Sequence, residues 1–128
     1  MSTAAETTTT VRPEMAVATS VQPMEPVVVH VRIPAYTTEM VRVWQSTFLL
    51  DRDSSHASRL LSFEKISLYP HWTKLDYTKP HVFTLIFEGL PASVRSFDLA
   101  EIIPDPNGFR IEAIARRLGD VYEVDVAF

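Results

Sequence analysis

The segment HVFTLIFEGL, residues 81–90, carries the clearest structural signal in the chain. Its side chains alternate between two sets that would face opposite sides of a β-strand, Phe83, Leu85 and Phe87 on one side and Val82, Thr84 and Ile86 on the other. Because both sets are mostly apolar, the pattern predicts a central strand that is covered on both faces. Gly89 and Pro91 end the strand.

Other segments share this period of two. In VVVHVRI, residues 27–33, every odd position is β-branched, and Pro34 ends the run. In DVYEVDVAF, residues 120–128, Tyr122, Val124, Val126 and Phe128 share one face, which should join the core formed around Phe83, Leu85 and Phe87. Apolar stretches at 41–50, 60–69 and 97–103 add further strands, although a helix is an open alternative for 60–69 up to Pro70.

Residues 109–118 fit two structures. As a helix they place Phe109, Ala113, Ile114 and Leu118 on one stripe, with Gly119 just beyond the end. As a strand they follow Asn107-Gly108, a strong reversal signal, and we favour this reading. The total is six or seven short strands separated by turns, which predicts an all-β, antiparallel β-sandwich.

Length and composition suggest one domain with an N-terminal arm. The chain has 128 residues, of which 46% are hydrophobic and 22% charged, as in ordinary globular proteins. Residues 1–26 are rich in Thr, Ala, Val and Pro and have few large apolar side chains. We therefore expect a disordered arm at 1–26 and a single β-sandwich domain at 27–128.

Composition also excludes several classes of function. The chain has no cysteine, so thiolate metal sites and cysteine catalysis are excluded. Its three glycines are far apart and form no phosphate-binding loop, and we expect no cofactor. A net charge of −4 argues against nucleic-acid binding. The start of the chain resembles no secretory signal, and no apolar stretch is long enough to span a membrane, so we expect a cytoplasmic location without membrane association.

The order of motifs FTLIFEGLP (83–91), SFDLAE (96–101) and GFRI (108–111) resembles uncharacterised bacterial β-sandwich domains with the pattern FTLxFExLP, FDLIE and GF. The resemblance covers the second half of the chain. It implies an immunoglobulin-like fold, in which Glu88 and Glu101 match recurrent acidic positions, and it implies no catalytic residues. Ala100 departs from the pattern, which more often has Ile there.

Two groups of polar residues are candidates for catalytic or metal-binding chemistry. The loop 51–56 places Asp51, Asp53 and His56 beside Ser54 and Ser55, a set that could ligate a metal or serve a hydrolase. Calcium-loop and nucleophile-elbow motifs are absent there, and Asp and Ser commonly bond their own backbone in turns. A second set consists of carboxylates that could act in acid–base catalysis, Glu64, Glu88, Asp98 and Glu101, although their strand positions favour solvent-facing sites.

The segment YPHWTKLDYTKPH, residues 69–81, interleaves aromatic and basic side chains. Aromatic rings with polar tips are typical of protein interfaces. We interpret the following residues as candidate partner contacts: Tyr69, His71, Trp72, Tyr77 and His81. The alternative is a long loop whose aromatic rings fold back onto the sandwich edge.

Two functions follow as hypotheses. The first is a non-enzymatic β-sandwich domain that acts by protein–protein interaction. The second is a small hydrolase or metal-dependent enzyme that uses the Asp51, Asp53 and His56 loop, and it requires His56 to lie near His71 or His81. We favour the first.

Overall fold

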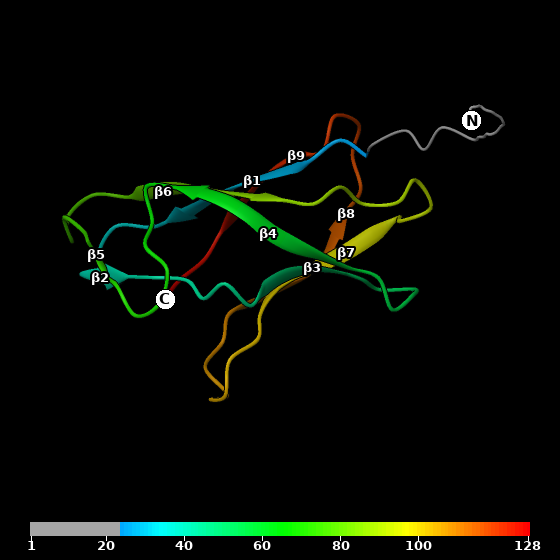
Figure 1. The fold of residues 1–128 in the computed structure, drawn as a ribbon. Helices are drawn as coiled ribbons and strands as arrows, with labels where there is room; N and C mark the ends of the chain where they lie inside the picture. Colours follow the sequence, from blue (N-terminus) through cyan, green and yellow to red (C-terminus); the bar gives the residue numbers. More distant parts are fainter. Residues whose placement is uncertain (1–23) are drawn as a thin grey trace, which may run out of the picture.

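The computed structural model describes residues 24–128, and all of their regular structure is β-strand (Figure 1). The strands are β1 (Val27–Ile33), β2 (Met40–Val41), β3 (Thr47–Asp51), β4 (Ala57–Glu64), β5 (Thr73–Lys74), β6 (His81–Phe87), β7 (Ser96–Glu101), β8 (Arg110–Ala115) and β9 (Val121–Asp125). The predicted all-β fold is confirmed. Within residues 24–128 there is no helix that could cross a membrane.

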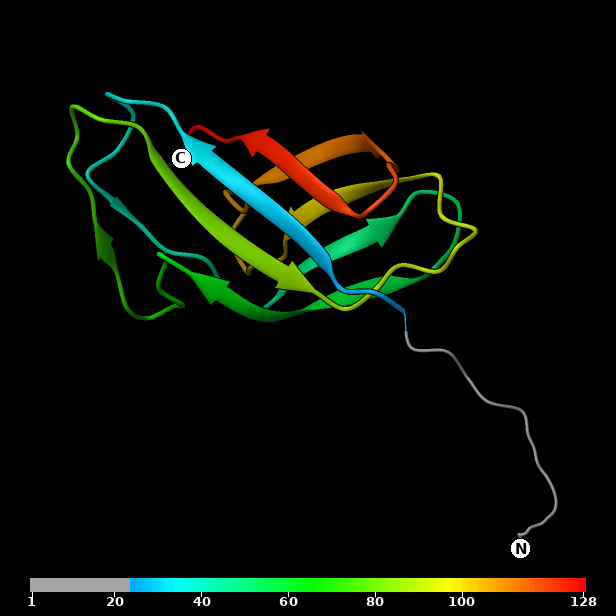
Figure 2. The same ribbon diagram turned by 90° about the horizontal axis from the view of Figure 1, so that it is seen from above.

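Seven strands form one curled sheet in the order β8-β7-β3-β4-β6-β1-β9, and β2 pairs with β5 in a small second sheet. The curl gives a sandwich-like shape, with β1, β6 and β9 in one layer and β3 and β7 in the other (Figures 1 and 2). Neighbouring strands are antiparallel except β1 and β9, which run parallel. The sheet is therefore mixed, whereas the sequence pattern predicted only antiparallel pairs.

Strand β4 belongs to both layers. Its first residues pair with β3, and its later residues pair with β6. The register shifts between Leu60 and Ser62, a β-bulge that bends the strand as it passes from one layer to the other. Near this bend the Glu88 carboxylate accepts hydrogen bonds from the Arg59 backbone N–H at 2.9 Å and from its guanidinium at 2.8 Å. The helix alternative for residues 60–69 is wrong.

The core lies on the inner face of the curled sheet. Phe83, Leu85 and Phe87 of β6 are fully buried, as predicted, and β6 is central because β4 and β1 flank it. The prediction that both faces of β6 are covered is wrong, since Val82 is 47% exposed. A curled sheet encloses one core, so the outer face of β6 meets solvent although its residues are largely apolar.

The C-terminal strand contributes to the same core. Tyr122 and Val126 are buried and Val124 is partly buried, as the alternating pattern predicted. The Tyr122 ring lies edge-on to Phe97 of β7, with ring centroids 5.1 Å apart, so it joins the two layers. Phe128, expected on this face too, remains 37% exposed.

Residues 110–115 form β8, so the helix alternative for 109–118 is wrong. The β7–β8 register shifts between Phe97 and Leu99, and Ala113 adopts a positive φ of 58° at this bulge. Its N–H donates to the buried Asp98 carboxylate at 2.9 Å. Burial would raise the pKa of Asp98, but this N–H and the guanidinium groups of Arg52 and Arg110 outweigh it and lower the pKa to about 2.

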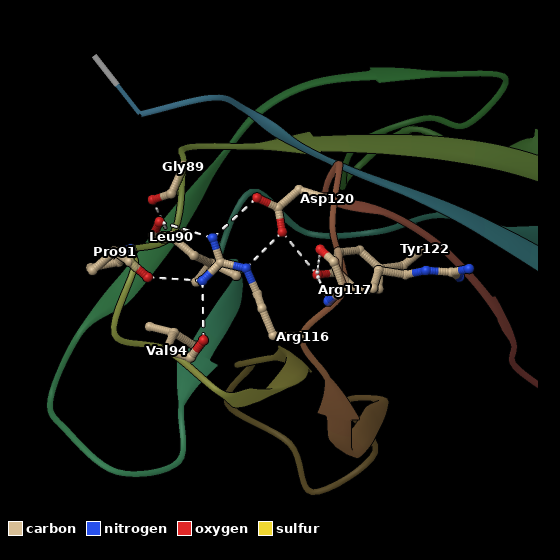
Figure 3. A network of polar contacts seen from close by, with 9 residues as sticks. Gly89, Leu90, Pro91, Val94, Arg116, Arg117, Asp120 and Tyr122 are labelled. Carbon is tan, nitrogen blue, oxygen red and sulfur yellow. Dashed lines mark hydrogen bonds and ion pairs between the residues drawn. The ribbon is translucent and has the colours of Figure 1, made fainter. Parts of the chain in front are cut away.

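At one end of the sandwich, Arg116 joins two connections between the layers (Figure 3). Its guanidinium donates to the Asp120 carboxylate at 2.7 and 3.1 Å. It also donates to three backbone carbonyls of the β6–β7 connection, those of Leu90, Pro91 and Val94. The Tyr122 hydroxyl completes the network by donating to Asp120 at 2.8 Å. One planar cation thus ties the β6–β7 connection to the β8–β9 turn.

Part of the predicted N-terminal arm lies against the domain. Residues 1–23 fall outside the described residues, but Met24 and Glu25 pass beside Gly89. A Cβ at Gly89 would come within 2.6 Å of the Glu25 carbonyl oxygen, so only glycine fits this approach. The last residues of the expected arm, Met24 and Glu25, therefore lie against the β6–β7 connection.

We expect Phe83→Ala and Phe87→Ala each to lower the free energy of unfolding by about 3–5 kcal/mol, because each leaves a cavity in a fully buried core. Urea denaturation measures both costs. Phe63→Ala is the control, since that ring on β4 is 38% exposed and should cost clearly less. Equal costs at all three positions would contradict the described faces of β4 and β6.

Arg116→Leu should lower the free energy of unfolding by about 3 kcal/mol or more, because it leaves a largely buried Asp120 carboxylate without its cation. Arg116→Lys should rescue only part of this loss, since one ammonium cannot replace the planar fork of five donors. Arg117→Leu changes the neighbouring exposed arginine and is the matched control. Similar thermal unfolding of the Leu variants at 116 and 117 would show that the network is dispensable.

Candidate functional site

Two long connections leave the sheet at the same end, opposite the β3–β4 turn, and pair with each other (Figures 1 and 2). They are residues 34–46, which follow β1, and residues 65–80, which join β4 to β6. Met40 of β2 pairs with Lys74 of β5, and Val43 forms a parallel bridge with Leu68. The aromatic segment 69–81 is therefore held against a second segment of chain.

Four side chains form a linked set at this end, which we call the aromatic stack: Arg42, Trp44, Tyr69 and Trp72. The Trp44 and Tyr69 rings are stacked, with centroids 3.9 Å apart and planes inclined by 23°. The Arg42 guanidinium lies 4.6 Å from the Tyr69 ring centroid and 3.8 Å from that of Trp72. Trp72 is 50% exposed and Tyr69 is 47% exposed, so the rings contact one another and solvent at once.

The local sequence explains how the stack forms. Val43 is fully buried, so its neighbours Arg42 and Trp44 project to the other side of the extended chain. The Tyr69 N–H donates to the Val43 carbonyl at 2.8 Å, which places Tyr69 beside them. Arg42 also donates to the Pro70 carbonyl at 3.1 Å, a bond that holds its guanidinium near Trp72.

The remaining predicted contact residues divide into two groups. Tyr77 lies edge-on to Tyr36 with centroids 5.5 Å apart, and both rings are exposed at the same end. His71 and His81 take no part in the ring contacts of the stack. The His71 backbone N–H donates to the Leu68 carbonyl, and His81 Nε2 donates to the Lys65 carbonyl at 2.8 Å.

A hollow of about 300 Å³ lies beside the stack. Its walls include Trp44 and Trp72 from the stack, Ile103, and the C-terminal Phe128. Most of the lining is apolar, and one carboxylate, that of Glu101, also faces the hollow. Thr38 and Arg42 also line the hollow, and an apolar hollow with a few polar groups is a common form of binding site.

Glu101 is held in an unfavourable environment for a negative charge. Burial raises the pKa of Glu101 above its ordinary value, and the opposing effects of the Trp44 and Phe109 N–H groups and of the Arg42 charge do not cancel it. Its Oε2 accepts a hydrogen bond from the backbone N–H of Trp44 at 3.0 Å. Within residues 24–128, Glu101 forms no ion pair.

The loop with Asp51, Asp53 and His56 bonds mainly to itself. Asp51 accepts hydrogen bonds from Ser54 Oγ at 2.6 Å and from the Asp53 N–H at 3.1 Å, and the Ser54 bond is the main cause that lowers the pKa of Asp51. His56 Nε2 bonds to the buried Ser58 hydroxyl, which in turn donates to the Gly89 carbonyl. These contacts are those of a turn that satisfies its own polar groups.

The histidines named by the enzyme hypothesis do not come together. His56 lies in the β3–β4 turn, whereas His71 lies in the connection between β4 and β6 and His81 begins β6. That turn and that connection are at opposite ends of the sandwich (Figure 1). In the part of the chain that the structure describes, no three His, Asp or Glu side chains are grouped as metal ligands would be. The arrangement that the enzyme hypothesis requires is therefore missing from residues 24–128.

Sequence reasoning missed three residues of the site. Arg42 and Trp44 belong to an apolar run whose pattern predicts a strand, and the position of Glu101 on a predicted strand favours a solvent-facing carboxylate. The alternation of Arg42 and Trp44 about Val43 is a signal that both project from the same side. No pattern in the sequence links Glu101 to Trp44, which lies 57 residues away.

Comparisons of the chain with protein families, curated proteins and solved structures found no match. The resemblance to bacterial immunoglobulin-like domains therefore stays a prediction, and the site must be interpreted from its own geometry.

We expect Glu101→Gln to gain stability relative to the natural protein as pH rises above the ordinary Glu value of 4.5. Because the pKa of Glu101 is raised in the folded state, ionisation of its carboxyl lowers the free energy of unfolding. Gln cannot ionise, so the variant avoids this loss. Urea denaturation from about pH 3 to about pH 8 covers the change on both sides of the ordinary Glu value. Glu88→Gln should show the opposite sign, because Arg59 lowers the pKa of Glu88. Parallel pH profiles for the two variants would refute the burial described for Glu101.

Proposed function

We propose that this chain is a non-enzymatic β-sandwich domain that binds another protein through the end that carries the aromatic stack. The observation that carries the proposal is Trp72, which is 50% exposed although an arginine holds its ring in place. A surface that keeps a large apolar ring exposed and fixed is typical of a contact site.

The residue types at this end support the proposal. Trp, Tyr and Arg are the residues most enriched among interface hot spots, and here they are clustered: Tyr36, Arg42, Trp44, Tyr69, Trp72 and Tyr77. Met40 is also exposed in this region and adds a flexible apolar side chain. Their rings would bury a large apolar area if a partner covered them.

The contacts among these residues also favour binding. Ordering a mobile side chain at an interface costs about 0.5–1.5 kcal/mol. Trp44 stacks on Tyr69, and Arg42 lies over the Trp72 ring, so both rings are restricted before a partner binds. Part of the entropy loss therefore occurs during folding and not during binding. The proposal includes a protein partner in the cytoplasm and no cofactor. We assign no second function to the loop 51–56, in which Asp51 bonds to Ser54, His56 to Ser58 and Arg52 to Asp98.

Trp72→Ala should weaken binding to the native partner by about 2 kcal/mol or more, which is about thirtyfold in the dissociation constant. The same change should lower the free energy of unfolding by no more than about 1 kcal/mol, because a half-exposed cation–π contact contributes little to the fold. Quantitative affinity capture from the native cell, followed by mass spectrometry, measures binding, and thermal unfolding measures stability.

Leu118→Ala is the matched control, since Leu118 is a fully exposed apolar residue in the turn at the other end of the sandwich. The proposal expects partners that the Trp72 variant loses and the Leu118 variant keeps. A Trp72 variant that keeps every captured protein but unfolds far more easily would show that the stack serves the fold alone.

A further inference from the structure

We propose that the hollow beside the aromatic stack receives a basic side chain, Lys or Arg, of the protein partner, with Glu101 as its counter-ion. This inference rests on the proposed function and names the chemistry of the partner residue that enters the site.

The first argument is charge. Glu101 faces the hollow and is about half buried, and it forms no ion pair within residues 24–128. Three other carboxylates that are at least partly buried form ion pairs with arginines: Glu88 with Arg59, Asp98 with Arg52 and Arg110, and Asp120 with Arg116. A cation that enters the hollow would supply the ion pair that Glu101 lacks, in a setting where water screens it less.

The second argument is the chemistry of the walls. Trp44 and Trp72 line the hollow, and Phe128 lies at its edge with 37% of its surface exposed. Aromatic faces attract cations, and indole attracts them most strongly. Ile103 and Met40 add apolar surface suited to the methylene stem of Lys or Arg. A volume of about 300 Å³ is ample for one such side chain.

Arg42 also lines the hollow, and it could attract an acidic residue instead. Its guanidinium is already engaged, because it lies over the Trp72 and Tyr69 rings and donates to the Pro70 carbonyl. Glu101 has no comparable cationic partner among the described residues. The Arg42 charge acts on Glu101 only from beyond ion-pair distance. The carboxylate is therefore the charged group of the hollow that lacks a direct partner, and a basic occupant supplies one.

The test uses the full chain and three capped pentapeptides that differ only at the central residue: arginine, its neutral isostere citrulline, or glutamate. NMR titration follows the indole N–H resonances of Trp44 and Trp72. We expect the arginine peptide to bind at least about tenfold more tightly than the citrulline peptide. In Glu101→Gln this preference should fall to about threefold or less. The Gln side-chain oxygen can still accept the hydrogen bond from the Trp44 backbone N–H, so the local structure is kept.

Glu112→Gln is the control, since it removes an exposed carboxylate from β8. It should leave the preference for arginine unchanged, and thermal unfolding confirms that each variant is folded. An unchanged preference in Glu101→Gln would overturn the assignment of the counter-ion.

The other outcomes separate this inference from the proposed function. Equal binding of the arginine and citrulline peptides, or preference for the glutamate peptide, would overturn the basic occupant and leave the contact surface in place. Failure of all three peptides to shift either indole resonance would also overturn the inference. The proposed function is then decided independently by capture with the Trp72 and Leu118 variants.

Discussion

The architecture depends on the continuity of β4, which pairs with β3 through its first residues and with β6 through its last. Because one strand belongs to both layers, the sheet must bend at the bulge between Leu60 and Ser62 and curl around a single core. The curl encloses one core, so the residues of β1 and β6 alternate between buried and more exposed positions. It also determines where connections can run, since chain that joins the layers must pass around the ends of the sandwich.

The two ends of the sandwich are built differently. At one end Arg116 joins the β6–β7 connection to the β8–β9 turn with charge-assisted hydrogen bonds, so this end is closed by polar contacts (Figure 3). At the other end the connections 34–46 and 65–80 pair as β2 and β5 and are held by ring contacts. The rings lie in the connections that flank this short two-stranded sheet, where Tyr69 and Trp72 stay about half exposed and accessible to a partner.

Strands with a strict period of two could be predicted from the sequence, because alternation reports directly which side chains face the core: β1, β6 and β9 are the examples. The exposure of Val82 could not be predicted from the sequence, because an apolar residue occurs on both buried and solvent-exposed faces. Within the site, residues 69–81 stood out by composition, yet their partners did not. Arg42 and Trp44 meet Tyr69 through the bridge between Val43 and Leu68, and Glu101 meets the Trp44 backbone across 57 residues, contacts that no local pattern records.

The central claim is that Trp72 is both exposed and fixed before any partner binds. NMR relaxation of its indole N–H in the isolated protein, combined with a soluble paramagnetic probe, measures both properties at once. The account predicts an order parameter near that of rigid backbone, about 0.85, together with strong broadening by the probe. An order parameter below about 0.6 would mean a mobile ring that Arg42 does not hold, and protection from the probe would mean a buried ring. Either result would contradict a preformed contact surface.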